Sequence, residues 1–353
     1  MACRLSFINV GYGEAILLEL PKQTILLDGG SNLASEYAGE AQRIKSLDYL
    51  KWRGIQKIDL LIITHIHEDH VCGVWHLLSN ASIEVKEVVL PFAVTAFAQL
   101  RRVIKPHNFA KYSSQIFYNA LYDYCQIIDY CICNNINIKH LEMGDSLILA
   151  TEQAKEIVAE RLLTANEPIT EFLTIIQQLS EYVIANRTEE LAEKVARLDY
   201  LSNATSMVLH IQEKSGESKT ASPKSLLDIL LPGDCTPNNW RFTKAEIASI
   251  KDVLLLKLPH HGQIDAIQAE KMAYLPLRYI VTSASNDHRN NSSRQEVYAE
   301  IAKWREHKIK TLFTEPVAEQ LYTLKEFNTA PLYQAIEIAF NTDTIDLNFV
   351  FVN

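Results

Sequence analysis

The sequence predicts an α/β (α+β) fold in which short buried strands alternate with helices. The first 30 residues contain three strand-like segments separated by turn residues, and helical patterns separate several later apolar runs of strand length. The 353 residues are 48% hydrophobic and 22% charged, and they contain no biased tract. This composition is typical of an ordinary globular core.

The first strands and helices follow from turn residues and apolar spacing. Gly11, Gly13 and Pro21 mark turns between the first segments, and Gly54 ends a helical pattern. The run Ile58–Ile63 is apolar throughout, as in a strand that is buried on both faces. The expected elements are strands at 4–10, 14–20 and 23–27, a helix at about 41–52, a strand at 58–63, a short helix at 74–78 and a strand at 85–90.

Two helical insertions, at about 93–135 and 151–201, are expected to interrupt a single domain that spans 1–353. Apolar residues recur at helical spacing from Ile169 to Val183, so one face of the second insertion should be buried. The strand pattern then returns. The expected strands are 206–212, 226–231, 253–258, 279–283, 335–340 and 345–352.

Charge and hydropathy exclude some classes of protein. No apolar run approaches the roughly 20 residues of a membrane helix, and the N-terminus does not resemble a targeting peptide. We therefore expect a cytoplasmic protein without a membrane association. The net charge of −9 argues against bulk electrostatic capture of nucleic acid, although it allows a local basic groove.

The strongest motif follows the buried strand at 58–63 and reads Thr64-His-Ile-His-Glu-Asp-His70. In an extended segment, residues two apart point the same way, so His65 and His67 can converge on one ion. After a turn, Asp69 and His70 can serve a second ion. Imidazole and carboxylate donors suit zinc, manganese or iron rather than calcium. A purely structural role would leave four ligand-type residues beside a buried strand without a reason.

Two later strands also end in residues of ligand type. One delivers Pro232-Gly233-Asp234, and the other delivers Pro259-His260-His261-Gly262. A Gly-Asp pair alone is typical of a plain turn, and adjacent histidines are only moderately specific. Three strand ends of this kind together indicate a site, because a rigid sheet positions such side chains.

The order of these motifs resembles that of the metallo-β-lactamase superfamily, whose fold is an αββα sandwich with metals along one edge of its sheets. The segments Asn9–Ala15, Ile25–Gly30 and Leu258–Gly262 are similar to motifs of one branch, the hydrolase domain of bacterial DNA-uptake competence channels and its stand-alone relatives. Phosphorylcholine esterases are also similar. Outside the helical insertions, the matches span nearly the whole chain.

The resemblance implies two divalent metal ions, zinc or manganese, and a role for each matching residue. His65 and His67 would hold the first metal, Asp69 and His70 the second, and Asp234 would bridge them. His261 is the preferred remaining ligand of the second metal, with His260 facing the substrate, although the two histidines are interchangeable at this stage. Asp28 would order the metal loop.

The chain departs from the family pattern at two places. Many members have a third histidine for the first metal, whereas this neighbourhood offers Asn203, Ser206 and His210. Asn203 matches the usual Asn of the branch, and the first metal is then expected to be held weakly or to be absent in the isolated protein. Near the C-terminus, the chain lacks the Tyr-Gly-His-Pro segment of the branch, so either His288 substitutes for it or that contact is lost.

The resemblance favours a phosphodiesterase or nuclease that uses a metal-bound hydroxide on nucleic acid or a nucleotide. Asp69 would also orient the nucleophile, and His260 would donate a proton to the phosphate or leaving group. Arg101 and Arg102 are candidate phosphate contacts, although a solvated helix end explains them equally well. A carboxylic-ester, lactone or thioester hydrolase is the main alternative, and a non-catalytic regulatory or binding module is the second. The helical insertions are candidate surfaces for a protein partner or a second copy.

Overall fold

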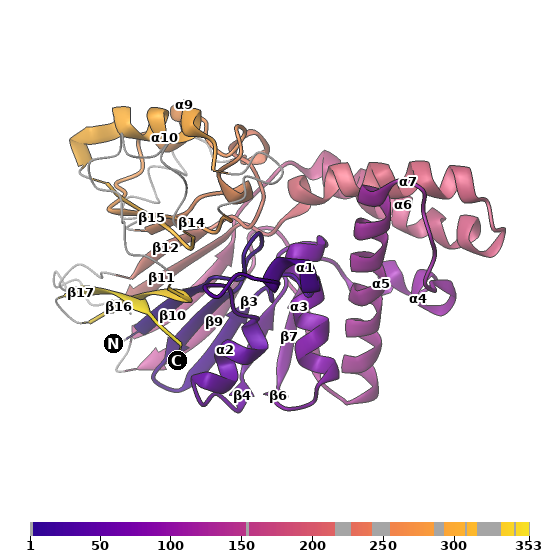
Figure 1. Ribbon diagram of the computed structural model, residues 1–353, viewed down its shortest axis with the longest axis horizontal. Coiled ribbons are helices and arrows are strands. Elements are labelled where there is room, and N and C mark those ends of the chain that lie inside the picture. The colour runs from indigo at the N-terminus through magenta and orange to yellow at the C-terminus, as the bar shows by residue number, and fades with distance from the viewer. Residues whose placement is uncertain are drawn as a thin grey trace.

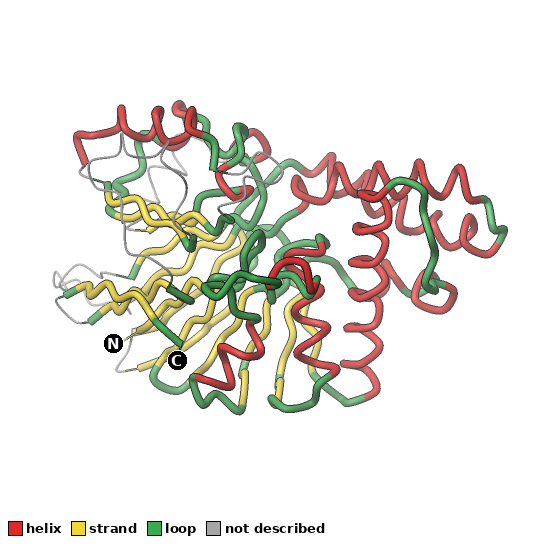
Figure 2. The backbone as a smooth tube through the Cα atoms, viewed as in Figure 1, coloured by secondary structure: helices red, strands yellow, loops and turns green. Residues whose placement is uncertain are grey.

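The computed structural model shows two β-sheets packed face to face, with helices on both outer faces (Figure 1). Figure 2 shows the same arrangement, with the helices outside the two layers of strands. The structure describes residues 3–152, 155–215, 227–241, 255–285, 293–307, 309–315, 333–341 and 344–352. The predicted αββα sandwich is therefore confirmed.

In the described ranges, the first sheet has eight strands in the order β17-β16-β1-β2-β3-β5-β7-β8. These strands are β1 (Cys3–Ile8), β2 (Ile16–Leu20), β3 (Gln23–Leu27), β5 (Leu60–Ile62), β7 (Glu87–Leu90), β8 (Asn137–His140), β16 (Ala335–Phe340) and β17 (Ile345–Val350). From β3 to β8 they run parallel, so their carboxyl ends meet at one edge. The short β4 (Lys57–Ile58) and β6 (Glu84–Val85) pair separately.

The second sheet has seven strands in the described part of the chain, in the order β15-β14-β13-β12-β11-β10-β9. These strands are β9 (Ser146–Glu152), β10 (Lys155–Arg161), β11 (Leu209–Ser215), β12 (Asp228–Leu231), β13 (Leu255–Lys257), β14 (Tyr279–Thr282) and β15 (Lys310–Phe313). From β12 to β15 they are parallel, which brings the segments after β12 and β13 to the same edge.

Strand β5 shows how the layers are held together. Its side chains alternate: Leu60 and Ile62 pack between the two sheets, whereas Leu61 and Ile63 pack under the helices. A strand buried on both faces must be apolar at every position, as this one is. Each fully buried aliphatic side chain of this kind contributes about 1.5–3 kcal/mol to folding.

Helices cover both outer faces (Figure 1). The first sheet is covered by α2 (Ser46–Trp52), α3 (Glu68–Ser79) and α5 (Tyr112–Cys133), and the second by α9 (Ala269–Met272) and α10 (Gln295–Ile301). The shorter helices are α1 (Ala34–Tyr37) and α4 (Leu100–Val103). None of the helices in the described ranges combines the length and the apolar character that crossing a bilayer requires.

A helical hairpin of α6 (Asn166–Ile184) and α7 (Thr188–Ser202) lies beside α5 and extends away from the sheets (Figure 1). Its base is anchored by aromatic stacking, since the ring centroids of Phe172 and Phe92 lie 5.0 Å apart. The chain leaves α7 through a short 3-10 turn, Asn203–Thr205, and then enters β11. The hairpin therefore returns the chain directly to the edge where the metal motif lies.

The boundaries of some predicted elements were wrong. Residues 151–152 end β9 and residues 155–161 form β10 rather than a helix, and the second helical insertion begins only at Asn166. The segment 155–161 is rich in helix-forming residues, but antiparallel pairing with β11 along its whole length holds it extended. The short helix expected at 74–78 is part of a longer one, because α3 begins at Glu68.

Candidate metal centre

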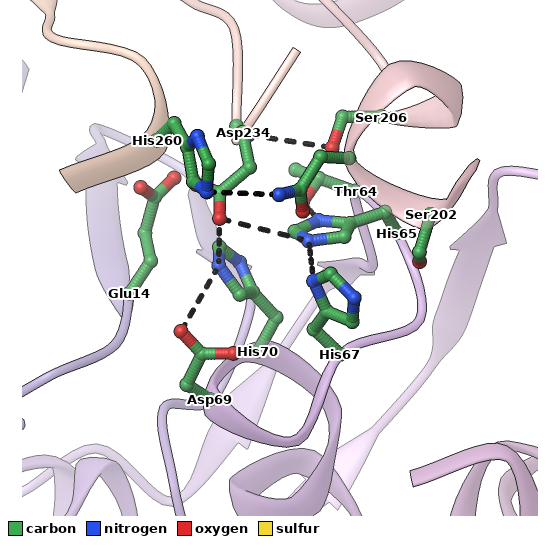
Figure 3. Close-up of polar contacts among 12 residues, drawn as sticks. Glu14, Thr64, His65, His67, Asp69, His70, Ser202, Ser206, Asp234 and His260 are labelled. Atoms are coloured by element: carbon green, nitrogen blue, oxygen red, sulfur yellow. Dashed lines mark hydrogen bonds and ion pairs between the residues drawn. The ribbon is translucent and has the colours of Figure 1, made fainter. Parts of the chain in front are cut away.

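The loop between β5 and α3 places four ligand-type side chains at the edge of the first sheet. His65 and His67 converge: His65 Nε2 lies 3.2 Å from His67 Nδ1. Figure 3 shows His65 and His70 in contact with the carboxylate of Asp234, with His67 next to His65. The extended backbone of His67 ends where α3 begins, and this turn brings Asp69 and His70 around to the same side.

Asp28, directly after β3, holds the loop between β5 and α3 in place. Its backbone is left-handed, with φ 55°. Its carboxylate accepts hydrogen bonds from the Thr64 amide at 2.8 Å, the Thr64 hydroxyl at 2.6 Å and His70 Nδ1 at 2.8 Å. Because Nδ1 of His70 is engaged by Asp28, its Nε2 faces the cluster.

The next residue, Gly29, allows the helix to approach closely. A Cβ at Gly73 in α3 would lie 1.9 Å from the Gly29 carbonyl oxygen, and a Cβ at Gly29 would lie 2.3 Å from the Val74 nitrogen. Any larger residue at either position would push α3 away from β3. Both glycines therefore set the depth at which His70 sits.

The second sheet contributes Asp234 and His261. Asp234 Oδ2 lies 3.2 Å from His261 Nε2, 3.5 Å from His70 Nε2 and 3.8 Å from His65 Nε2. His261 Nδ1 donates to the Ser283 carbonyl at 2.8 Å, which turns Nε2 towards Asp69 Oδ2 at 3.1 Å. Of the two adjacent histidines, the structure thus brings His261 into the cluster.

The side chains form two donor groups that share Asp234. One comprises Asp69, His70, Asp234 and His261, and the other comprises His65, His67 and Asp234, with the ligand atoms of each group within 4.8 Å of one another. The buried Nε2 atoms of His70 and His261 both face the carboxylate of Asp234. Inward-facing imidazole nitrogens beside carboxylates fit a transition-metal ion such as zinc or manganese.

The electrostatics of the cluster also suit cations. Burial alone would lower the pKa of His261, but the negative charges of Asp234 and Asp69 outweigh it and raise the pKa to about 9. Burial alone would raise the pKa of Asp69, but His70 and His261 lower it to about 2. The carboxylates that attract a proton to His261 would attract a metal ion in the same way.

Three charged residues around the cluster were not predicted as site residues from the sequence: Lys257, Glu14 and Asp199. Lys257 is fully buried, contacts Glu14, donates to the Gly233 carbonyl at 2.9 Å and lies 3.4 Å from Asp234 Oδ1. Asp199 on α7 lies 3.3 Å from His67 Nε2. A lone Lys in a strand or a lone Asp on a helix carries no local signal, so only the fold reveals these contacts.

A cavity of about 420 Å³ opens onto the centre. Three members of the donor groups line it, His67, Asp69 and Asp234, together with the aromatic residues Tyr12, Tyr112 and Phe117. Among the described residues that line it, none is Lys or Arg.

The remaining predicted site residues lie in different places. His260 and Asn203 also line the cavity. Arg101 pairs with Asp129 on α5, and neither Arg101 nor the exposed Arg102 lines the cavity. His210 pairs with Asp228 at 2.7 Å, and His288 lies outside the described residues.

Comparison with known proteins agrees with this architecture. Residues 8–92, which include the β3 end and the whole of the His65–His70 motif, match the model of the metallo-beta-lactamase superfamily. The chain has the metallo-β-lactamase fold. No curated protein matches the chain.

Solved structures with a similar fold share little sequence with the chain. The metallo-beta-lactamase fold protein YhfI from Bacillus subtilis is 13% identical, with a TM-score of 0.41, over 96% of this chain and 100% of that one. The short form of human tRNase Z is 15% identical, with a TM-score of 0.39, over 95% of this chain and 98% of that one. Zn²⁺-bound PqqB from Methylobacterium extorquens is 8% identical, with a TM-score of 0.40, over 86% and 96%. Such values do not transfer an activity to this chain.

Proposed function

We propose that the protein is a metal-dependent hydrolase that cleaves a phosphodiester bond. The observation that supports this proposal most directly is the pair of donor groups that share Asp234. Two adjacent metal ions, zinc or manganese, would lower the pKa of a coordinated water towards neutrality and stabilise negative charge on phosphoryl oxygens. The competence-channel resemblance of the flanking motifs supports a nucleotide or nucleic acid as the substrate.

The chain's own residues would orient the donors and admit the substrate. Asp28 and the Ser283 carbonyl fix the rings of His70 and His261, so that each presents Nε2 to the centre. His67 and Asp69 lie in the cavity wall, where a bound substrate would reach both donor groups. A cavity of about 420 Å³ has the size of a small-ligand site. We therefore propose that a nucleotide, or a single-stranded end, enters it.

A carboxylic-ester, lactone or thioester hydrolase is the second candidate. Its support is the cavity wall, in which Leu33, Ile116 and Phe117 supply apolar surface. The described residues that line the cavity include neither Lys nor Arg to bind a second phosphate. An apolar acyl group would suit such a wall better than a polyanion.

The test is a substrate panel on protein loaded separately with manganese and with zinc. The substrates are bis-p-nitrophenyl phosphate, single-stranded DNA, double-stranded DNA, RNA and p-nitrophenyl butyrate. We expect metal-dependent cleavage of the phosphodiesters. Asp69→Ala should lower kcat by at least about 10³-fold, because it removes a donor that also faces the substrate.

Asp48→Ala, on the exposed face of α2, is the matched control and should retain full activity. Cleavage of the butyrate alone would replace the phosphodiesterase with the ester hydrolase. Full activity of Asp69→Ala, with its circular dichroism spectrum unchanged, would refute the assignment of the site.

A further inference from the structure

The two donor groups of the centre are unequal. Counting the His, Cys, Asp and Glu side chains of the described residues, the group around His261 has four donors, whereas the other has three: His65, His67 and the shared Asp234. The sequence supplies no third histidine at the usual place, and His210 is engaged elsewhere by Asp228. A further protein donor for the first group would therefore have to come from another residue type.

Asn203 is held next to this group by the end of the helical hairpin. The preceding residue, Ser202, donates its hydroxyl to the Ile66 carbonyl at 2.9 Å, which ties the end of α7 to the loop between His65 and His67. Asn203 itself lines the same cavity as His67 and Asp234. Its side chain therefore faces the cavity onto which His67 and Asp234 open.

A chain of hydrogen bonds determines which end of the Asn203 amide faces His260. The Asp265 carboxylate can only accept, so His260 Nδ1, 2.8 Å from Asp265 Oδ1, carries the proton. In the neutral ring, His260 Nε2 is then an acceptor, and it receives the Asn203 Nδ2 donor at 2.9 Å. This arrangement leaves Asn203 Oδ1 pointing away from His260.

Asn203 Oδ1 is buried and lacks a hydrogen-bond partner among the residues that the structure describes. Buried polar atoms are normally satisfied, and a buried acceptor left unpaired lowers stability. A metal ion bound by the neighbouring donor group would supply the partner that this oxygen lacks.

We infer that Asn203 Oδ1 is the fourth protein donor of the first metal site, and that the His260–Asp265 pair holds it in that orientation. The inference rests on the proposed metal centre and deepens it. It makes His260 a positioning residue rather than a proton donor, because both of its ring nitrogens are engaged. A neutral amide oxygen is a harder donor than imidazole, so the first site should favour Mn²⁺ more than a three-histidine site does.

The test measures metal binding directly, without substrate. Zn²⁺ is titrated against a chelating dye, and Mn²⁺ binding is followed by electron paramagnetic resonance, in the parent protein, Asn203→Leu and Asp265→Ala. The parent should bind two ions. Asn203→Leu should lower the affinity for one ion by at least about tenfold and leave the affinity for the other unchanged. Asp265→Ala should lower the affinity for the same ion, because His260 can then carry its proton on Nε2, which would reverse the Asn203 amide.

Two further variants sharpen the result. Asn203→Asp keeps an oxygen at the same place and should preserve binding of two ions. Asn119→Leu makes the same chemical change on the exposed face of α5 and should match the parent. Asp265 is partly exposed, with 42% of its side chain accessible, so its variant tests the idea even if Asn203→Leu does not fold.

The inference would be overturned if Asn203→Leu bound two ions with unchanged affinities. If Asn203→Leu does not fold, the same result in a folded Asp265→Ala would overturn it. Either outcome would leave the proposed hydrolase intact. A parent that binds no metal would instead overturn the proposed function and this inference with it. A parent that binds two ions but cleaves no substrate would refute only the hydrolase.

Discussion

Lys257 illustrates how a single residue shapes the centre. Its ammonium group lies wholly inside the protein, in contact with Glu14 and 3.4 Å from Asp234 Oδ1. Burial alone would lower the pKa of Lys257, but Glu14 and Asp234 outweigh it and raise the pKa. The charged lysine therefore balances the buried carboxylates, and its bond to the Gly233 carbonyl fixes the turn that presents Asp234.

We predict that Lys257→Met destabilises the metal-free protein by about 3–5 kcal/mol, because it leaves Glu14 buried without its counter-charge. Urea denaturation gives the free energy of unfolding. Lys155→Met is the matched control: it breaks a partly exposed pair with Glu213 and should cost about 0–1 kcal/mol. The double variant Glu14→Gln/Lys257→Met should recover part of the loss. Equal stability of Lys257→Met and the parent would contradict this role.

At the scale of elements, α5 matters because it packs across α3, the helix that begins within the metal motif. Asp123 on α5 lies on this interface, beside Cys72 of α3. Burial raises the pKa of Asp123 to about 6. Folding therefore makes Asp123 harder to ionise than it is in the unfolded chain, and its ionisation works against the packing of the two helices.

The sign of this effect predicts a pH dependence. Since the folded pKa of about 6 exceeds the unfolded value of about 3.9, stability from Asp123 is complete below pH 4 and is lost as the pH rises through 6. Asp123→Asn should therefore raise the free energy of unfolding by about 1–2 kcal/mol at pH 7.5, with a smaller gain at pH 4.5. Urea denaturation at both values tests this. A gain that is independent of pH would show that ionisation is not its cause.

At the scale of the whole molecule, the centre joins the two sheets. His65, His67, Asp69 and His70 follow a strand of the first sheet, whereas Asp234 and His261 follow strands of the second. Without metal, the sheets are held together mainly by the apolar layer between them. Metal ions bound by donors from both sides would add a direct link at one edge.

Metal should therefore stabilise the folded protein as a whole. At a free metal concentration 100 times the Kd, one site contributes about 2.7 kcal/mol. We predict that chelation lowers Tm, that adding Zn²⁺ or Mn²⁺ restores it, and that the shift in Asp69→Ala is smaller. Thermal unfolding followed by circular dichroism gives the comparison. The same Tm with and without metal in the parent would argue against a link between the sheets.

The sequence by itself determined the parts of the molecule that have a local signal. The strand Leu60–Ile62 is apolar at every position, and the residues after it have the spacing of a metal-binding motif, so both were predictable. The order of the motifs indicated the αββα fold. The strand at 155–161 was not predictable, because its helix-forming residues are held extended by pairing with β11.

Only the tertiary structure decided the contacts between distant segments. Neighbouring His260 and His261 both have left-handed φ values, 46° and 49°, and nothing local distinguishes them. Their partners do so: Ser283 turns His261 into the cluster, and Asp265 turns His260 towards Asn203. Periodicity and motifs report what one segment does, whereas the partner of a buried polar atom depends on which other segments the fold brings to it.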